Sequence, residues 1–324
     1  MMKRQNLLKK AWAQFDRAHS FVLACHQRPD GDALGAALAL AHVLRKCGKD
    51  VVVLSEDAVP DNYRFIPESE MVVAKTNRRD FDVGVLVDCE GIARCGTAAD
   101  AVLSAKTTAC VDHHIPEGEF GDVRVVDRRA SSTAEVVVEL LDANGVQIDK
   151  TAATQLLTGL IADTGAFRFA NTSPRTFHTA ARLADLGADA SIIAREVYDS
   201  RPLRAVKLLG RALSCIETDD DGSIVWSAIT KRDLDELGAT DTDTESIINH
   251  ITAVKGPKVA VLFRETEPNS IRVSLRSRGG IDMNEVAKAF GGGGHVAAAG
   301  CTVDASLDDA KRIVIEEVTR WMAS

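Results

Sequence analysis

The chain has 324 residues, 45% of them hydrophobic and 27% charged, and its formal net charge at pH 7 is −8. This length favours two ordinary domains, and no apolar run approaches the ~18 residues of a membrane span. A protein that grips long nucleic acid is normally basic, because lysine and arginine must replace the counterions of many phosphates. The acidic balance therefore argues against a long duplex partner and leaves room for a short anionic substrate, and the lack of a long apolar run argues against a membrane.

The N-terminal segment and the cysteines indicate a cytoplasmic protein. The first 20 residues carry positive charges but no apolar core, which predicts an amphipathic helix and not a signal peptide. The seven cysteines are scattered, mostly within apolar runs, and form no CxxC pair. This usage predicts reduced, buried thiols in place of a disulfide framework or a zinc ribbon.

The first half of the chain alternates strand-like and helix-like segments. Continuous apolar runs predict buried strands of a parallel sheet at 21–25, 51–55, 81–88 and 107–114. Helices are expected over 32–47, which Gly48 would end, over 131–145 and over 151–167. Ser132 and Glu135 have the spacing of a capping box at the start of the second of these helices.

Beyond about residue 190 the pattern changes. Segments 223–230, 258–266 and 270–278 alternate apolar and polar residues, which predicts strands with one solvated face, and a helix is expected over 306–322. We therefore predict an α/β protein: a doubly wound, mainly parallel sheet domain over 1–190, a helical linker over 191–215, and a smaller α+β domain over 216–324.

Ligand-type side chains follow three of the predicted strands, and the carboxyl ends of parallel strands meet at one edge of a sheet. With one carboxylate from the end of a predicted helix, the set is His26, Asp30, Asp32, Asp88, Asp112, His113, His114 and Asp163. So much negative charge at short range is unfavourable unless divalent cations compensate it. Imidazoles and carboxylates without thiolates favour two Mn²⁺ ions, with Mg²⁺, Co²⁺ and Fe²⁺ as alternatives.

Each of these residues taken alone has a simpler explanation. Asp32 would be a helix N-cap, and Asp88 would begin an Asx-turn. Their joint occurrence at several element ends favours the metal site. Cys89 and Cys95 are close enough in sequence to be considered as ligands, but we expect them to be buried and inert.

Five segments resemble a known family. HQRPDGDALGAALAL, VLVDCE, VDHH and GLIADTGAFRF resemble, in order, the four motifs of the DHH phosphoesterases. SLRSRGGIDMNEVAKAFGGGGHVAAAG, at 274–300, resembles the glycine-rich signature of their DHH-associated C-terminal domain. The motifs extend from residue 26 to residue 300, and the chain is most similar to the stand-alone NrnA-type branch of nanoRNases and pAp phosphatases.

The resemblance implies a specific set of ligands and roles. One Mn²⁺ would be held by His26, Asp30 and Asp88, and the other by Asp32, Asp88, His113 and Asp163, with Asp88 as the bridge. Asp112 would orient a ligating imidazole. His114 would face the substrate, either to hydrogen-bond the scissile phosphate or to protonate the leaving oxygen, while the two metals activate a hydroxide.

The run of four glycines at 291–294 has two interpretations. A bare glycine run is often a flexible hinge, but glycines also let backbone N–H groups approach a phosphate. Neighbouring Arg276 and His295 favour the phosphate pocket. The expected substrate-binding residues are Arg276, Ser277, Gly292, Gly293, Gly294 and His295, together with Ser132 and Thr133 of the first domain.

The resemblance implies hydrolysis of short RNA and of linear dinucleotides such as pApA and pGpG, and conversion of pAp to AMP. One alternative is a soluble cyclic-di-AMP phosphodiesterase, and another is a non-catalytic nucleotide-sensing protein of the same fold. Apolar positions on the linker helices would suit a homodimer.

Overall fold

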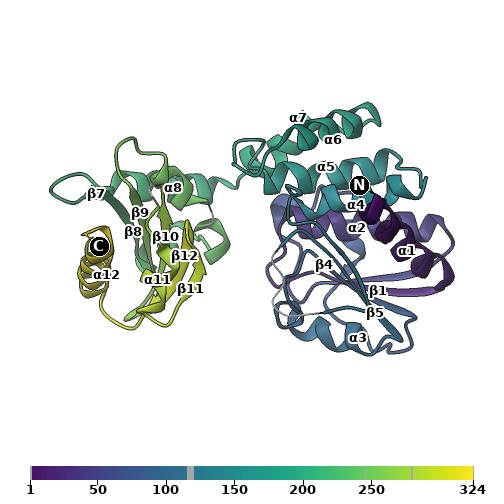
Figure 1. Ribbon diagram of the computed structural model, residues 1–324. Helices are drawn as coiled ribbons and strands as arrows, with labels where there is room; N and C mark the ends of the chain where they lie inside the picture. The colour runs from purple at the N-terminus through teal and green to yellow at the C-terminus, as the bar shows by residue number, and fades with distance from the viewer. Residues whose placement is uncertain (1, 115–119, 245, 279, 324) are drawn as a thin grey trace. The chain divides into compact units, whose positions relative to one another are not determined.

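The computed structural model describes residues 2–114, 120–244, 246–278 and 280–323 of the chain (Figure 1). The chain divides into two compact units, residues 1–200 and residues 201–324. Within the described residues, no helix combines the length and the apolar character that crossing a membrane requires.

The first unit is built on a parallel sheet, as predicted. Its strands run in the order β3-β2-β1-β4-β5-β6. They are β1 (Ser20–Ala24), β2 (Asp50–Leu54), β3 (Val72–Val73), β4 (Val83–Val87), β5 (Thr107–Asp112) and β6 (Val123–Val126). Strands β1 and β4 are buried at every position, which explains their uninterrupted apolar sequences. The short outer strands β3 and β6 were not predicted.

Helices cover both faces of this sheet, so the doubly wound α/β prediction is confirmed. They are α1 (Met2–Arg17), α2 (Gly31–Lys46), α3 (Ala99–Leu103), α4 (Thr133–Ala143), α5 (Lys150–Asp163), α6 (Pro174–Asp185) and α7 (Ala190–Ala194). In Figure 1, α1, α2, α4 and α5 lie on one side of the sheet and α3 on the other. Successive residues of β1 alternate accordingly: Phe21 and Leu23 enter one core, and Val22 and Ala24 the other.

Helices α2 and α5 pack closely because each carries a glycine at the contact. A Cβ atom at Gly35 would lie 2.3 Å from the carbonyl oxygen of Gln155, and one at Gly159 would lie 2.6 Å from Oδ1 of Asp32. The alanine-rich sequence of α2 keeps the rest of this contact narrow as well. The close approach matters for function because α2 begins beside Asp30 and Asp32, and α5 ends at Asp163.

Two helix starts differ from the sequence-based expectation. Asp30, and not Asp32, is the N-cap of α2, since its Oδ1 accepts hydrogen bonds from the backbone N–H groups of Asp32 and Ala33 at 2.9 and 3.0 Å. Ser132 caps α4 by accepting from the N–H of Glu135. In a capping box the Glu135 carboxylate would accept from the N–H of Ser132. Here it accepts from the N–H of Ser131 at 2.7 Å.

The second unit contains a mixed sheet in the order β11-β12-β10-β9-β8-β7, in which β8 and β9 are parallel and the other neighbours antiparallel. Its strands are β7 (Glu217–Thr218), β8 (Ile224–Ile229), β9 (Val259–Glu267), β10 (Ser270–Ser277), β11 (Gly293–His295) and β12 (Ala298–Val303). Its helices are α8 (Leu203–Ser214), α9 (Lys231–Leu237), α10 (Ile247–Thr252), α11 (Met283–Lys288) and α12 (Leu307–Ala323).

The prediction of one solvated face for segments 223–230, 258–266 and 270–278 is wrong for β8 and β9; in β8, Ile224 packs into one core and Val225 and Ile229 into the other. Val261 and Phe263 pack into a core with residues of α11 and α12, while Ala260 and Leu262 pack into a second core with residues of α8 and α10. Helices therefore cover both faces of the central strand, and its residues 259–263 are all buried. The segment 191–215 is shared between the units, since α7 belongs to the first and α8 to the second.

We expect Gly35→Ala to destabilise the first unit by about 1–3 kcal/mol, because the added methyl group overlaps a backbone carbonyl that cannot move aside. Thermal or urea unfolding measures the loss. Gly210→Ala in α8 is the control, since a Cβ atom there meets nothing within 4 Å and alanine favours a helix. Equal stability of the two variants would contradict the close-packing argument.

Candidate metal centre

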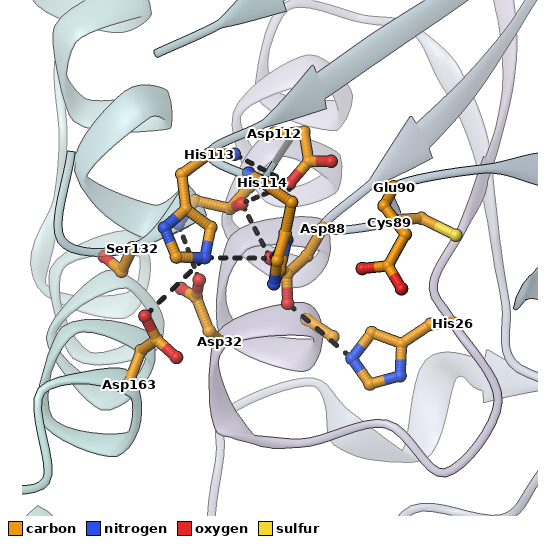
Figure 2. Close-up of polar contacts among 12 residues, drawn as sticks. His26, Asp32, Asp88, Cys89, Glu90, Asp112, His113, His114, Ser132 and Asp163 are labelled. Atoms are coloured by element: carbon orange, nitrogen blue, oxygen red, sulfur yellow. Dashed lines mark hydrogen bonds and ion pairs between the residues drawn. The ribbon is translucent and has the colours of Figure 1, made fainter. Parts of the chain in front are cut away.

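The candidate site lies at the carboxyl edge of the parallel sheet (Figure 2). The turn after β1 carries His26 and Asp30, β4 is followed directly by Asp88, and β5 is followed by His113 and His114. Because neighbouring parallel strands end at the same edge, residues far apart in sequence meet there. Potential ligand atoms fall into three overlapping groups, each within 4.8 Å: Asp88, His113 and His114; His26, Asp30 and Asp88; and Asp32, His113 and Asp163.

The group of His26, Asp30 and Asp88 is arranged around the imidazole of His26. Its Nε2 lies 3.9 Å from Oδ1 of Asp30 and 3.7 Å from Oδ2 of Asp88. The other ring nitrogen, Nδ1, lies 2.8 Å from the carbonyl oxygen of Gln27, to which it donates when protonated. In the neutral imidazole this bond places the proton on Nδ1, so the lone pair of Nε2 is available to a cation between His26 and the two carboxylates.

A second set of carboxylates, those of Asp88 and Asp163, lies around the imidazole of His113. Its Nε2 lies 3.6 Å from Oδ2 of Asp163 and 3.8 Å from Oδ1 of Asp88. Its Nδ1 is 3.3 Å from the carbonyl oxygen of Ala130. Nε2 is buried and has no hydrogen-bond partner. Since a buried polar atom normally has a partner, this nitrogen indicates a position for a ligand.

Asp88 stands between the two groups. Its Oδ2 faces His26, and its Oδ1 faces His113 while accepting a hydrogen bond from Oγ1 of Thr133 at 2.8 Å. The residue is 2% exposed and has a left-handed backbone with φ of 56°. Such a conformation costs energy and is concentrated at functional sites. The geometry suits a carboxylate that bridges two cations.

Asp32 is fully buried and is held by the start of α4. Its Oδ2 accepts from the backbone N–H of Thr133 at 2.6 Å, and its Oδ1 accepts from that of Ala134 at 2.9 Å. The positive end of the helix dipole favours a carboxylate at this place. The free N–H groups of α4 therefore fix the orientation of Asp32.

His114 forms a third contact with the site, and its partner is Asp112. Nδ1 of His114 lies 2.9 Å from Oδ1 of Asp112, and the same oxygen accepts from the backbone N–H groups of His113 and His114. Asp112 thus orients the imidazole of His114 and not that of His113. His114 also shares a group of ligand atoms with Asp88 and His113, whereas the motif resemblance assigned it to substrate alone.

The charges in the site respond to one another. Burial and the charges of Asp88 and Asp163 raise the pKa of Asp32 well above its ordinary value. Burial, reinforced by Asp88, likewise raises the pKa of Asp163 to about 7. For Asp88 burial acts in the same direction, but the facing imidazole of His26 and its neighbours outweigh it and lower the pKa to about 2. The protein alone thus favours protonation of some carboxylates, and a divalent cation would remove that need.

The donors fit divalent cations in both chemistry and spacing. Two atoms that each lie about 2.1 Å from an ion are about 3.0 Å apart at a right angle and about 4.2 Å apart on opposite sides. The separations of 3.6–3.9 Å around His26 and His113 fall within this range. They are too long for hydrogen bonds. Imidazole and carboxylate donors without thiolate suit Mn²⁺, Fe²⁺, Co²⁺ or Mg²⁺.

Other residues that the sequence singled out in the first unit are buried in its interior. Ser132 and Thr133 are fully buried, so in this structure their hydroxyl groups face protein atoms and not solvent. Thr133 holds Asp32 and Asp88 through its N–H and its hydroxyl group, a role that sequence reasoning missed. Cys89 and Cys95 are buried, their sulfur atoms lie 3.2 Å apart, and neither belongs to a candidate metal group of the described residues.

The second unit places the predicted anion-binding residues around β10 and β11. Arg276 is half-buried, and its Nη1 donates a hydrogen bond to the backbone carbonyl oxygen of Leu275 at 3.0 Å. Burial lowers the pKa of its guanidinium group. Within the described part of the chain no carboxylate forms an ion pair with Arg276. A half-buried cation without a counter-charge suits an anionic ligand.

Gly293 and Gly294 of the glycine run lie in the edge strand β11, and the glycines of the run differ in what they require. A Cβ atom at Gly292 would lie 2.2 Å from the Gly300 carbonyl oxygen, and Gly294 has a φ of 149°. A Cβ atom at Gly294 would in turn lie 2.6 Å from the Ala298 carbonyl oxygen, so packing against β12 explains why both positions are glycine. Gly293 has neither constraint, since a Cβ atom there would meet only Oδ1 of Asn284 at 3.6 Å. Gly293 and His295 are both exposed.

Comparisons with known proteins agree with this architecture. The model of the DHH family, N-terminal domain, matches residues 20–160, and that of the DHHA1 domain matches residues 221–324. The chain belongs to the DHH family of phosphoesterases.

Two curated relatives are named bifunctional oligoribonuclease and PAP phosphatase NrnA. The protein from Thermus thermophilus is 32% identical over 299 residues, which cover 91% of this chain and 88% of the relative. The protein from Bacillus subtilis is 27% identical over 301 residues, covering 92% and 93%. Among solved structures, an exopolyphosphatase-related protein from Bacteroides fragilis matches with a TM-score of 0.92 at 26% identity, covering 98% of this chain and 96% of the other.

We expect Mn²⁺ to raise the melting temperature of the chelator-treated protein. A ligand at 100 times its Kd adds about 2.7 kcal/mol per site, or about 5–10 °C for a unit of this size. Asp88→Asn should lose most of this gain. Asp82→Asn is the matched control, because Asp82 precedes β4 at the opposite edge of the sheet, where it accepts from the N–H groups of His19 and Ser20. An equal gain in both variants would contradict the assignment of Asp88.

Proposed function

We propose that this protein is a metal-dependent phosphodiesterase that hydrolyses short oligoribonucleotides and linear dinucleotides such as pApA and pGpG to mononucleotides, and pAp to AMP. The observation that most supports this proposal is the position of Asp88, whose two carboxylate oxygens face different groups of ligand atoms. The names of the two NrnA relatives support the choice of substrates. The seven free cysteines fit a cytoplasmic enzyme.

The proposed centre holds two Mn²⁺ ions, with Mg²⁺, Co²⁺ and Fe²⁺ as alternatives. When bound, such ions neutralise phosphoryl oxygens and lower the pKa of water. His26, Asp30 and Asp88 would hold one ion, and Asp32, His113, Asp163 and Asp88 the other. Thr133 keeps Oδ1 of Asp88 in place, and the N-terminus of α4 keeps Asp32 in place. The ligands are thus fixed before substrate arrives, which is the basis of electrostatic preorganisation.

Asp112 and His114 supply the proton chemistry in this proposal. Burial lowers the pKa of His114, but the hydrogen bond to Asp112 and the charge of Asp88 outweigh it and raise the pKa to about 9. In the metal-free protein the imidazole is then protonated near neutral pH, with Nδ1–H donated to Asp112. Nε2–H is free to donate to the scissile phosphate or to protonate the leaving oxygen.

We propose that residues 1–190 form the catalytic domain, that 191–215 link the domains, and that 216–324 bind substrate. Arg276, Ser277, Gly292, Gly293, Gly294 and His295 would contact the part of the substrate beyond the scissile phosphate. The unconstrained Gly293 supports this, because a close ligand explains the missing side chain where packing does not. Few phosphates need be contacted, so an acidic chain can bind a short RNA. The exposed Ile192, Leu203 and Val206 of the linker segment are the basis for proposing a homodimer.

Product analysis tests the function. We expect chromatography to show mononucleotides from labelled 2- to 10-mers and AMP from pAp with Mn²⁺, and no reaction with chelator. Asp88→Asn should retain less than about one hundredth of the activity, because even residues behind a metal ligand typically account for about 10- to 100-fold. Asp82→Asn should remain active. Faster cleavage of cyclic-di-AMP would favour the cyclic-dinucleotide alternative, and binding without turnover would favour a sensor.

Arg276→Ala tests substrate binding by the second unit. Loss of a hydrogen bond to a charged group costs about 1.5–3 kcal/mol, so KM should rise about 10- to 100-fold with little change in kcat. Arg278→Ala is the control, since Arg278 lies two residues further along the chain and is exposed. An unchanged KM in Arg276→Ala would remove Arg276 from the anion pocket.

A further inference from the structure

Asn171 connects two parts of the candidate metal centre, although the motif analysis gave it no role. Its Nδ2 lies 2.9 Å from the carbonyl oxygen of Ser131, 3.1 Å from that of Asp163, and 3.3 Å from Oδ2 of Asp163. The same oxygen of Asp163 faces Nε2 of His113 at 3.6 Å. The amide of Asn171 therefore donates to the carboxylate oxygen that points to the buried, unpartnered imidazole nitrogen.

The other end of this connection is also part of the site. Ser131 immediately precedes Ser132, the N-cap of α4, and Thr133, which donates to Asp32 and to Asp88. By binding the Ser131 carbonyl, Asn171 links Asp163 at the end of α5 to the segment that orients Asp32 and Asp88. Of the carboxylates in the site the amide contacts that of Asp163, and because it is neutral it adds no charge that would compete with a cation.

The turn between Asp163 and Asn171 determines where the amide lies. Gly165, Ala166 and Phe167 all have positive φ values, between 54° and 65°. Such strain persists only where the surroundings fix it. Here Thr164 does so: its carbonyl oxygen accepts from the N–H groups of Arg168 and Phe169 at 2.9 and 3.0 Å, and its hydroxyl oxygen accepts from that of Phe167 at 3.1 Å. The turn returns the chain to Asp163.

We propose that Asn171 is a positioning residue: its amide orients the carboxylate of Asp163 toward the second cation and holds it at a fixed position relative to Asp32. The inference rests on the proposed two-metal function. It assigns Asn171 an effect on one of the two cation positions, since Asn171 touches Asp163 but neither His26 nor Asp30. Removal of the amide allows the Asp163 side chain to rotate and removes the hydrogen bond to the Ser131 carbonyl oxygen.

Titration of the chelator-treated protein with Mn²⁺ in a calorimeter tests the proposal. The wild type should bind two ions, and Asn171→Ala should bind one ion normally and the other about 10- to 100-fold more weakly. Asn144→Ala is the matched control, because the Asn144 amide also bridges two backbone carbonyls, those of Leu8 and Leu140, away from the candidate ligands. The control should bind both ions as the wild type does.

The other outcomes are distinct. Equal affinities for both ions in Asn171→Ala and the wild type would overturn the positioning role, as would equal losses in Asn171→Ala and Asn144→Ala, which would indicate general destabilisation. No Mn²⁺ binding by the wild type would overturn the proposed function itself. Thermal unfolding with chelator establishes that each variant is folded. If Asn171→Ala is not, Asn171→Ser, which also removes the amide but keeps a short polar side chain, is expected to show the same selective loss.

Discussion

Asp88 has a left-handed backbone between two groups of ligand atoms, and Asp30, Asp32 and Asp163 lie close around it. The repulsion among these carboxylates, strengthened by burial, is the constraint that the rest of the first unit must meet. It contributes to the raised pKa of Asp163, whereas at Asp88 the facing imidazoles of His26, His113 and His114 outweigh it and lower the pKa. Divalent cations bound at this site would satisfy the constraint without protonation of any ligand.

The scaffold meets the constraint with neutral donors. The first N–H groups of α4 hold Asp32, the hydroxyl group of Thr133 holds Asp88, and the amide of Asn171 lies against Asp163. A lysine or arginine in any of these places would oppose binding of a cation. Glycines at the contact between α2 and α5 bring the remaining parts together, because Gly159 leaves the space that the Asp32 carboxylate occupies.

Much of this could be predicted from sequence because it depends on local patterns. Apolar runs located the buried strands, and the residues after them, such as Asp88 and His113, meet because parallel strands end at one edge. The pairing of Asp112 with His114 depends on how the chain turns after β5, and the contacts of Asn171 depend on geometry across elements; sequence spacing encodes neither. The burial of both faces of β9 was missed for a related reason, since its polar residues lie only at its outer end and the covering helices come from elsewhere in the chain.

The non-local origin of the centre has a consequence for biosynthesis. The ligand atoms come from residues 26 to 163, so a nascent chain has no complete coordination shell until α5 has left the ribosome and docked against α2. In a zinc finger the metal drives a short segment to fold. Here the parallel sheet, whose long-range pairings form slowly, must come first. If the centre binds cations as proposed, metallation would be a late event in maturation, and chelation would leave a folded apoprotein ready to be reloaded.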